Sequence, residues 1–242
     1  DLLPKPGIIS HADKSLELPA GGGALIAKTL YELSNNEIHF FTALGKDYYG
    51  KKSFDFFDKI GINIHVAWRS ESTRKGFSLI DTNGERSITV IGKRLAPSYN
   101  DDLDWNILSD MDGIFITAGD NNLFKKAREA NTLCSTPRVG LDLINQSKVK
   151  LDALIGSNLD PDESYLLSDL KRKPMYIIKT EGEKGGIYIP GGRFNANKKS
   201  ELKIDSYGCG DSFAAGITYG LTAKWPIEKA LKLGTVLGRN CI

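Results

Sequence analysis

The segment Asp205-Ser-Tyr-Gly-Cys-Gly-Asp211 leads directly into a stretch in which Phe213, Ile217 and Leu221 recur at helical spacing. Glycines permit backbone conformations that other residues avoid, so the successive amides of residues 208–210 could point at one anion. The positive end of the following helix adds to that attraction. The segment therefore predicts an anion-binding turn at the start of a helix.

Asp211 gives this turn a second chemical function. It could simply cap the helix, or it could face whatever the turn binds. A carboxylate beside an anion cradle would repel a phosphate unless it had a separate task, such as accepting the proton of a hydroxyl that attacks the phosphate. Phosphoryl transfer needs positioning, charge neutralisation and a base for the acceptor. The combination favours phosphoryl transfer, with a capping aspartate as the alternative.

Helical and strand patterns alternate over most of the chain, as is typical of a parallel sheet covered by helices. A helix is predicted over 24–33, a strand over 38–44, and a second helix around Phe54, Phe57 and Ile60. Further strands are predicted over 113–117, 138–143, 153–156 and 175–180. The pattern predicts a doubly wound α/β core with three α/β/α layers.

One region breaks the alternation, because residues 62–67, 76–81 and 86–91 read as consecutive strands. Asn83-Gly84 separates the last two and is typical of a type I′ hairpin. We interpret a small antiparallel sheet, mainly within 62–95, as a lid or an edge extension. Arg74 and Lys75 lie between its strands, where they could meet a carboxylate or phosphate of a substrate or could simply be solvated.

The composition excludes several classes of protein. The chain has 242 residues, 40% hydrophobic and 26% charged, with a formal charge of +2 from interspersed residues. We therefore expect a globular protein without a nucleic-acid partner. No stretch approaches the roughly 20 apolar residues that span a bilayer, and the N-terminus lacks signal-peptide features, so we expect a cytoplasmic protein without a membrane partner.

The segment ending at Asp211 resembles the D-[TS]-x-G-A-G-D motif of the ribokinase-like, or PfkB, carbohydrate kinases, with Cys209 where alanine is usual. The resemblance covers nearly the whole chain, because weaker motifs of the family precede this segment in the family's order. They are Gly21-Gly-Gly-Ala24, Ala43-Leu-Gly-Lys-Asp-Tyr-Tyr-Gly50, Asn83-Gly-Glu-Arg-Ser87, Thr117-Ala-Gly-Asp120 and Thr180-Glu-Gly-Glu-Lys-Gly185.

This resemblance implies a ribokinase-like fold and an ATP-dependent carbohydrate kinase, which transfers the γ-phosphate of ATP to a hydroxyl of a small sugar or sugar-like substrate. Asp211 would be the general base, and the amides of Gly208, Cys209 and Gly210 the anion hole. The substrate-binding residues that it implies are Asp1, Gly21, Gly22, Gly23 and Asp47. The nucleotide-binding residues that the resemblance implies are Thr180, Gly182, Gly185, Asn158 and Asp205.

The resemblance also implies Mg²⁺, held largely by the phosphates, and admits a monovalent cation and a homodimer formed through the lid. Asn158 resembles the start of the family's N-x-x-E motif, but Pro161 occupies the glutamate position, so Glu163 is a displaced substitute as a metal-placing residue. Ile26 stands where the family has an asparagine for sugar hydroxyls. We expect a single domain over 1–242 that is either truncated at both ends or a diminished relative.

Other functions remain as alternatives. A nucleoside kinase of the same fold and a non-catalytic ligand-binding relative both fit the motifs. The segment Gly45-Lys-Asp-Tyr-Tyr-Gly-Lys-Lys52 also approaches a P-loop, but Lys52 stands where that motif needs a hydroxyl for magnesium. The retention of Asp211 with both flanking glycines favours catalysis over binding alone.

Overall fold

The computed structural model describes residues 7, 9, 11, 14–34, 36–80, 86–196 and 207–239. Asp1 and Asp205, which were predicted to bind substrate and nucleotide, lie outside these ranges. The Asn83-Gly84 turn also lies outside them.

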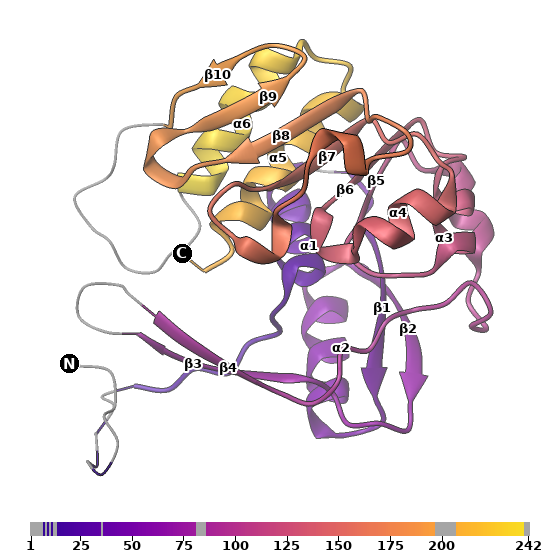
Figure 1. Cartoon of the computed structure of the whole chain (residues 1–242). Coiled ribbons are helices and arrows are strands. Elements are labelled where there is room, and N and C mark those ends of the chain that lie inside the picture. The colour runs from indigo at the N-terminus through magenta and orange to yellow at the C-terminus, as the bar shows by residue number, and fades with distance from the viewer. Residues whose placement is uncertain are drawn as a thin grey trace.

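The centre of the fold is a six-stranded sheet in the order β10-β9-β8-β7-β6-β5 (Figure 1). Strands β5 to β8 are parallel, and β9 and β10 add antiparallel strands at one edge. The bounds are Gly113–Ile116 for β5, Thr132–Ser135 for β6, Ala153–Ser157 for β7, Tyr176–Thr180 for β8, Gly186–Ile189 for β9 and Arg193–Phe194 for β10.

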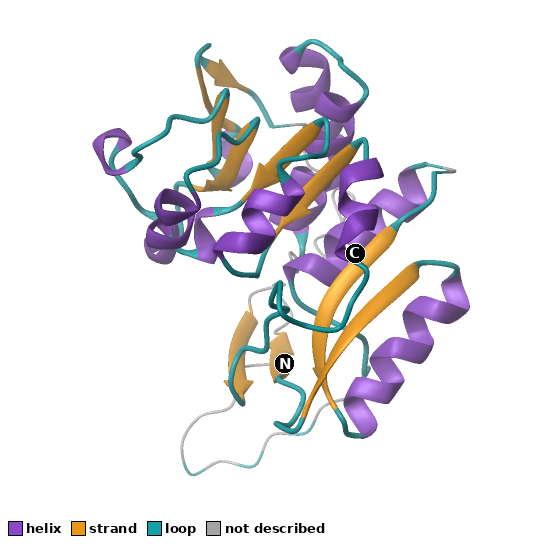
Figure 2. Ribbon diagram, turned by 90° about the vertical axis from the view of Figure 1, so that its right-hand side faces the viewer, coloured by secondary structure: helices purple, strands orange, loops and turns teal. Residues whose placement is uncertain are grey.

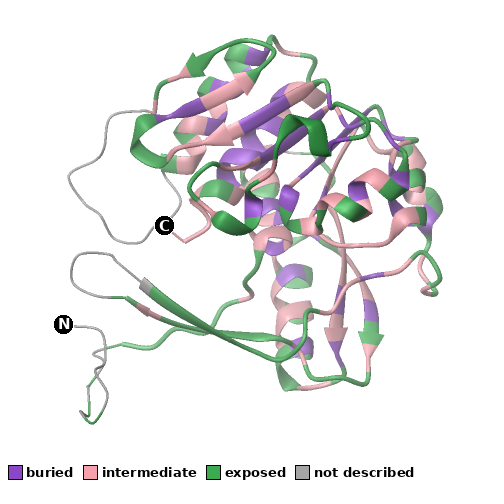
Figure 3. Ribbon diagram, viewed as in Figure 1, coloured by how far each residue is buried: buried purple, intermediate pink, exposed green. Residues whose placement is uncertain are grey.

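Helices cover both faces of this sheet. One face packs against α3 (Asn121–Ala127) and α4 (Leu141–Ser147), and the other against α1 (Gly22–Leu33), α5 (Cys209–Thr222) and α6 (Ile227–Arg239). Successive strand residues enter opposite cores, as Leu154 and Ile155 do, because side chains alternate along a strand. Figure 3 shows the buried residues concentrated in the sheet and α5. The predicted three-layer α/β/α core is confirmed.

A second unit is built from β1 (His39–Gly45), α2 (Tyr48–Ile60) and β2 (Asn63–Arg69). The two strands pair in parallel, with α2 beside them (Figure 2). Helix α1 links this unit to the main body, since Ile26 packs in the core of the large sheet and Ala27 in the core around Phe57. The expectation that 62–67 joins the lid sheet is therefore wrong, because β2 pairs with β1.

The region predicted to be a lid or an edge extension contains a two-stranded antiparallel ribbon of β3 (Lys75–Ile80) and β4 (Arg86–Ile91), which we call the lid. Its register pairs Lys75 with Ile91 and Ile80 with Arg86, which confirms the predicted pairing of these two segments. The ribbon extends away from the body and is largely exposed (Figures 1 and 3).

The predicted strand over 138–143 is wrong. The strand lies earlier, at β6, and Pro137 begins a short 3-10 helix, η2 (Pro137–Val139), before α4. Proline suits the first turn of a helix but lacks the N–H that a central strand needs. The other short helices are η1 (Trp105–Asp110), η3 (Pro161–Glu163), η4 (Leu167–Asp169) and η5 (Gly182–Lys184).

Across the described ranges, every helix is too short or too polar to span a bilayer.

Candidate active site

The starts of helices α1 and α5 meet, although they lie near opposite ends of the chain. The Gly21 N–H donates to the Tyr207 hydroxyl over 2.9 Å. A Cβ added to Gly22 would lie 2.7 Å from Oδ1 of Asp211, closer than real contacts allow. The carboxylate of Asp211 therefore rests directly against the bare Cα of Gly22, and the predicted glycine turn and the predicted base come together.

The predicted anion-hole residues lie at the N-terminal end of α5. Gly208 is the N-cap and has a left-handed φ of 83°, which glycine adopts without strain. The helical hydrogen bond from the Ser212 N–H to the Gly208 oxygen, 2.8 Å long, follows it. The first N–H groups of a helix point out of its end, and Asp211 lies in that first turn. The predicted opening of a glycine turn into a helix is confirmed.

The same place is bounded by the carboxyl end of β5. A Cβ on Gly23 would lie 3.1 Å from Oγ1 of Thr117, the residue directly after β5. In open α/β sheets, ligands bind outside the carboxyl ends of the strands. Ile26 is only 4% exposed and packs in the core, so it does not supply the side chain that the family places at its sugar.

Arg138 links this edge to the segment after β7. Its Nε donates to Oε1 of Glu163 over 2.6 Å, and its Nη2 pairs with Asp160. Burial alone would lower the pKa of Arg138, but the hydrogen bond to Glu163 and the carboxylates of Glu163, Asp160 and Asp211 raise it above its usual value. The Arg138 cation is thus within electrostatic reach of the predicted base.

Glu163 has a structural environment that does not fit direct metal ligation. It is 7% exposed, and its Oε2 accepts from the Ser157 N–H over 2.6 Å while Oε1 accepts from Arg138. Both oxygens are therefore held by protein donors. Among the described residues, no three His, Cys, Asp or Glu side chains gather where they could hold a metal ion.

The predicted nucleotide residues cluster at the carboxyl ends of β7 and β8. The Asn158 N–H donates to the Thr180 oxygen over 2.8 Å, and its Nδ2 donates to Oε1 of Glu181 over 3.0 Å. Gly182 and Gly185 have φ values of 59° and 84° and close the loop with a 3.1 Å hydrogen bond. The loop over 180–185 is thus a tight turn next to Asn158.

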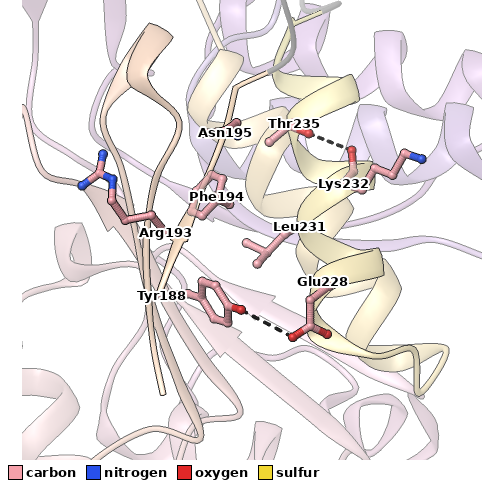
Figure 4. Close-up of a pocket in the computed structure, with 8 residues that line it drawn as sticks. All are labelled: Tyr188, Arg193, Phe194, Asn195, Glu228, Leu231, Lys232 and Thr235. Carbon is pink, nitrogen blue, oxygen red and sulfur yellow. Dashed lines mark hydrogen bonds between the residues drawn. The ribbon is translucent and has the colours of Figure 1, made fainter. Parts of the chain in front are cut away.

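A pocket adjoins this loop on the side of α6 (Figure 4). Arg193, on its rim, donates to Oε2 of Glu181 over 2.5 Å, which joins the pocket wall to the loop. Tyr188 and Glu228 are linked across it by a 3.4 Å hydrogen bond. The lining residues are Tyr188, Arg193, Phe194, Asn195, Glu228, Leu231, Lys232 and Thr235.

Asp47, predicted to bind substrate, holds the base of the lid in the structure. Its Oδ1 accepts from the Gly50 N–H and the Thr73 hydroxyl, both over 2.8 Å, and its Oδ2 accepts from the Thr73 N–H over 2.7 Å. Burial would raise the pKa of Asp47, but these hydrogen bonds lower it below its usual value. Its described contacts thus do not include the turn at Gly22.

Sequence reasoning missed three residues that the fold brings to the site: Arg94, Arg138 and Tyr207. Arg94 follows the lid and Arg138 follows β6, and each belongs to no motif. Arg138 has one sequence signal, a position just after a strand of the large sheet, at the edge where ligands bind. Arg94 follows β4 of the separate ribbon and has no such signal. Tyr207 was within the quoted motif, but nothing in the motif indicates that its hydroxyl accepts from Gly21.

The chain is thus an α/β protein whose candidate site lies where the starts of α1 and α5 meet the carboxyl edge of the parallel strands. The family model for pfkB family carbohydrate kinases matches residues 5–242, so the chain belongs to that family. No curated protein matches the chain.

Solved structures share the fold at low sequence identity. A ribokinase from Thermotoga maritima has a TM-score of 0.75 at 20% identity, covering 97% of this chain and 84% of its own. A ribokinase from Arabidopsis thaliana, solved with ribose and ATP, has a TM-score of 0.73 at 17% identity, covering 99% and 86%. A nucleoside kinase from Methanocaldococcus jannaschii has a TM-score of 0.68 at 17% identity, covering 98% and 84%. The predicted ribokinase-like fold is confirmed.

Proposed function

We propose that the protein is an ATP-dependent kinase that phosphorylates a hydroxyl of a small sugar or sugar-like substrate. The observation that carries this proposal is the contact between Asp211 and Gly22. It places a carboxylate at the N-terminal end of α5 and against the glycine turn that resembles the family's sugar-binding turn. An acceptor seated on Gly21–Gly23 would then present its hydroxyl to Asp211.

The chemistry follows from this placement. Asp211 accepts the proton of the acceptor hydroxyl, whose oxygen forms a bond to the γ-phosphorus while the bond from that phosphorus to the β-phosphate oxygen breaks, releasing ADP. The amides of Gly208, Cys209 and Gly210 and the end of α5 stabilise the charge on the transferred group. Such transfer depends mainly on positioning and electrostatics.

We assign the nucleotide to Thr180, Gly182, Gly185 and Asn158. These residues lie at the carboxyl ends of β7 and β8, on the same edge of the sheet as the N-terminal end of α5. A neighbour solved with ribose and ATP supports ATP as the phosphate donor. We propose that any magnesium ion is held mainly by the phosphates, since Glu163 is engaged with Arg138 and Ser157. A monovalent cation, a homodimer through the lid and a cytoplasmic location complete the proposal.

The decisive experiment replaces the proposed base. With Mg-ATP and a panel of sugars, sugar acids, sugar phosphates and nucleosides, we expect ADP release with at least one acceptor. Asp211→Asn should lower kcat by about a hundredfold or more, as is typical when a general base is lost. Melting curves establish that the variant is folded.

Asp142→Asn is the matched control, because Asp142 also lies in the first turn of a helix, α4, is exposed, and is not among the residues assigned to the site. It should leave kcat unchanged. Equal rates for wild type and Asp211→Asn would refute the proposed base. Binding of a panel member without ADP release would instead favour a non-catalytic relative, and turnover of nucleosides alone would favour a nucleoside kinase, for which the Methanocaldococcus jannaschii neighbour is a precedent of fold.

A further inference from the structure

Three arginines from separate elements gather at the acceptor side of the candidate site. Arg74 directly precedes β3, Arg94 follows β4, and Arg138 lies in η2 after β6. None of them belongs to a motif that resembles the family. Their common position is the base of the lid, next to the carboxyl ends of β5 and β6.

Arg94 is the centre of this cluster. Its Nη2 donates to the Thr117 oxygen over 2.5 Å, and its Nη1 donates to the Arg138 oxygen over 3.2 Å. The side chain of Thr117 is the one that faces Gly23. The Arg94 guanidinium is therefore anchored on the strand end that borders the glycine turn.

The lid brings Arg74 to the same place. The pairing of Lys75 with Ile91 sets Arg74 opposite Gly92, and a Cβ on Gly92 would lie 3.6 Å from the Cα of Arg74. Thr73, the preceding residue, is fixed by its two hydrogen bonds to Asp47. The base of the lid thus holds Arg74 beside the segment that leads to Arg94.

The arginines of this cluster differ in whether carboxylates neutralise their positive charge. Arg138 is paired with Glu163 and Asp160. Arg94 donates to two carbonyl oxygens, and none of the ion pairs between described residues includes it. Partial desolvation, with the cations of Arg74 and Arg138, lowers the pKa of Arg94 below its usual value. A bound anion would relieve this repulsion.

We propose that the acceptor substrate carries an oxyanion, a carboxylate or a phosphate, which binds Arg94 together with Arg74 and Arg138 while the acceptor hydroxyl reaches Asp211. This inference rests on the proposed function and narrows its substrate class to sugar acids and sugar phosphates. The planar guanidinium matches both oxyanions, because its parallel N–H groups can each donate to a separate oxygen.

The position of Arg94, the centre of the cluster, assigns the anion to the acceptor rather than to ATP, whereas Arg138 extends toward the segment after β7 through Glu163 and Asp160. Arg94 is bonded to the residue after β5, at one edge of the six-stranded sheet. The nucleotide loop over 180–185 follows β8, and two strands, β6 and β7, lie between β5 and β8. The glycine turn at Gly21–Gly23 is on the Arg94 side, through Thr117.

The test compares matched acceptors that differ only in charge: a neutral sugar, the corresponding aldonic acid and the corresponding sugar monophosphate. At least one anionic member should have the higher kcat/KM, and which one it is identifies the oxyanion. Arg94→Gln should lower the preference for that acceptor over the neutral sugar by roughly tenfold or more, as is typical for loss of a charge-assisted hydrogen bond. The effect should appear in KM for the acceptor.

Arg172→Gln is the control, because Arg172 is an exposed arginine outside the site and should behave as wild type. Arg94→Lys, which keeps the charge but loses the planar fork, should retain part of the preference. Preference for the neutral sugar, or an equal response of Arg94→Gln and Arg172→Gln, would overturn the proposal. If Arg94→Gln does not fold, Arg74→Gln is measured in its place and should lower the same preference for the anionic acceptor.

A binding measurement separates this proposal from the proposed function. Thermal shift with the anionic acceptor alone, without ATP, needs no turnover. Stabilisation of wild type and of Asp211→Asn, but not of Arg94→Gln, supports the anion site even if no ADP is released with any acceptor. Failure of every anionic acceptor to stabilise the wild type would overturn it.

Discussion

Among single residues, Gly22 decides the geometry of the site, because it has no side chain. The carboxylate of Asp211 occupies the space that any side chain at position 22 would fill. The starts of α1 and α5 approach each other closely at this point, and only glycine, which has no Cβ, leaves room for the carboxylate. Gly210, by contrast, faces open space, where a Cβ would meet no atom within 4 Å.

Gly22→Ala tests this close approach. The new methyl group would push the Asp211 carboxylate away from the position where it can reach an acceptor hydroxyl, so we expect kcat to fall by roughly tenfold or more, since small displacements of catalytic groups are costly. The melting temperature should change little, because alanine suits the first turn of α1. Steady-state kinetics with the best acceptor and a melting curve measure both quantities.

Gly192→Ala serves as the control, since a Cβ there meets no atom within 4 Å. It should have wild-type kinetics. A fully active Gly22→Ala would show that the carboxylate can work from a different position, and the geometric basis of the proposed mechanism would be lost.

At the scale of elements, one ion pair fastens β2 to the segment that follows the lid. Arg69 donates to both oxygens of Asp101 over 2.6 Å and to the Ala96 oxygen over 2.9 Å. Because both partners are mostly buried, the bond is worth more than an exposed pair. It holds the β1-α2-β2 unit against the main body.

Asp101→Asn should weaken this fastening. We expect a loss of about 2 kcal/mol in the free energy of unfolding, since a hydrogen bond to a charged group contributes roughly 1.5–3 kcal/mol. The hydrogen bond from Arg69 lowers the pKa of Asp101 below its usual value of 3.8. The stability from this carboxylate is therefore fully present above about pH 4 and is lost as pH falls through the lowered pKa.

Urea unfolding at pH 7 and at several values below pH 4 measures both effects. The difference between wild type and Asp101→Asn should shrink as the pH falls. Asp102→Asn, at the exposed neighbouring position, should match wild type at every pH. A difference that stayed constant down to the lowest pH would contradict the role assigned to the Asp101 charge.

The lid is an element with more apolar surface than its own two strands can bury. On one face of the ribbon, Ile80, Ile88 and Val90 are 47%, 45% and 46% exposed. An isolated two-stranded ribbon is marginally stable in water, and exposed apolar patches mark interaction surfaces. We expect this face to pair with the same face of a second copy.

Val90→Glu should therefore yield a monomer where the wild type sediments as a dimer. Phe77→Glu is the matched variant on the opposite face of the ribbon, where Phe77 is 61% exposed, and should remain dimeric. Sedimentation velocity over a range of concentrations distinguishes the two. A monomeric wild type would refute the dimer, and dissociation by Phe77→Glu alone would place the interface on the other face.

At the scale of the whole molecule, the sequence predicted the layers and the central motif but not all of their connections. Periodicity reports burial along a single element, so β1, β7 and β8 were expected close to where they occur. It does not report partners, and for this reason the segment now seen as β2 was assigned to the wrong sheet. The short strand β6 was missed because Pro137 follows it so closely.

In the candidate site, too, local sequence predicted some residues, while others became apparent only from the three-dimensional structure. Asp211 was predicted as the base from local chemistry, and the structure places it beside the predicted glycine turn. Arg94 and Arg138 were not predicted, because their relevance arises only from three-dimensional proximity between segments that share no motif. Asp47 and Glu163 were assigned by resemblance, and their described contacts hold the lid base and Arg138 instead.

The hydrogen bond between Gly21 and Tyr207 joins residues 186 positions apart in the chain. Contacts of such long sequence separation form late and slowly, since a large loop must close before they are made. The glycine turn that would hold an acceptor is thus synthesised long before Asp211, which would act on that acceptor. A ribosome-bound nascent chain would accordingly have no activity until α5 emerges, and partial translation products would be inert.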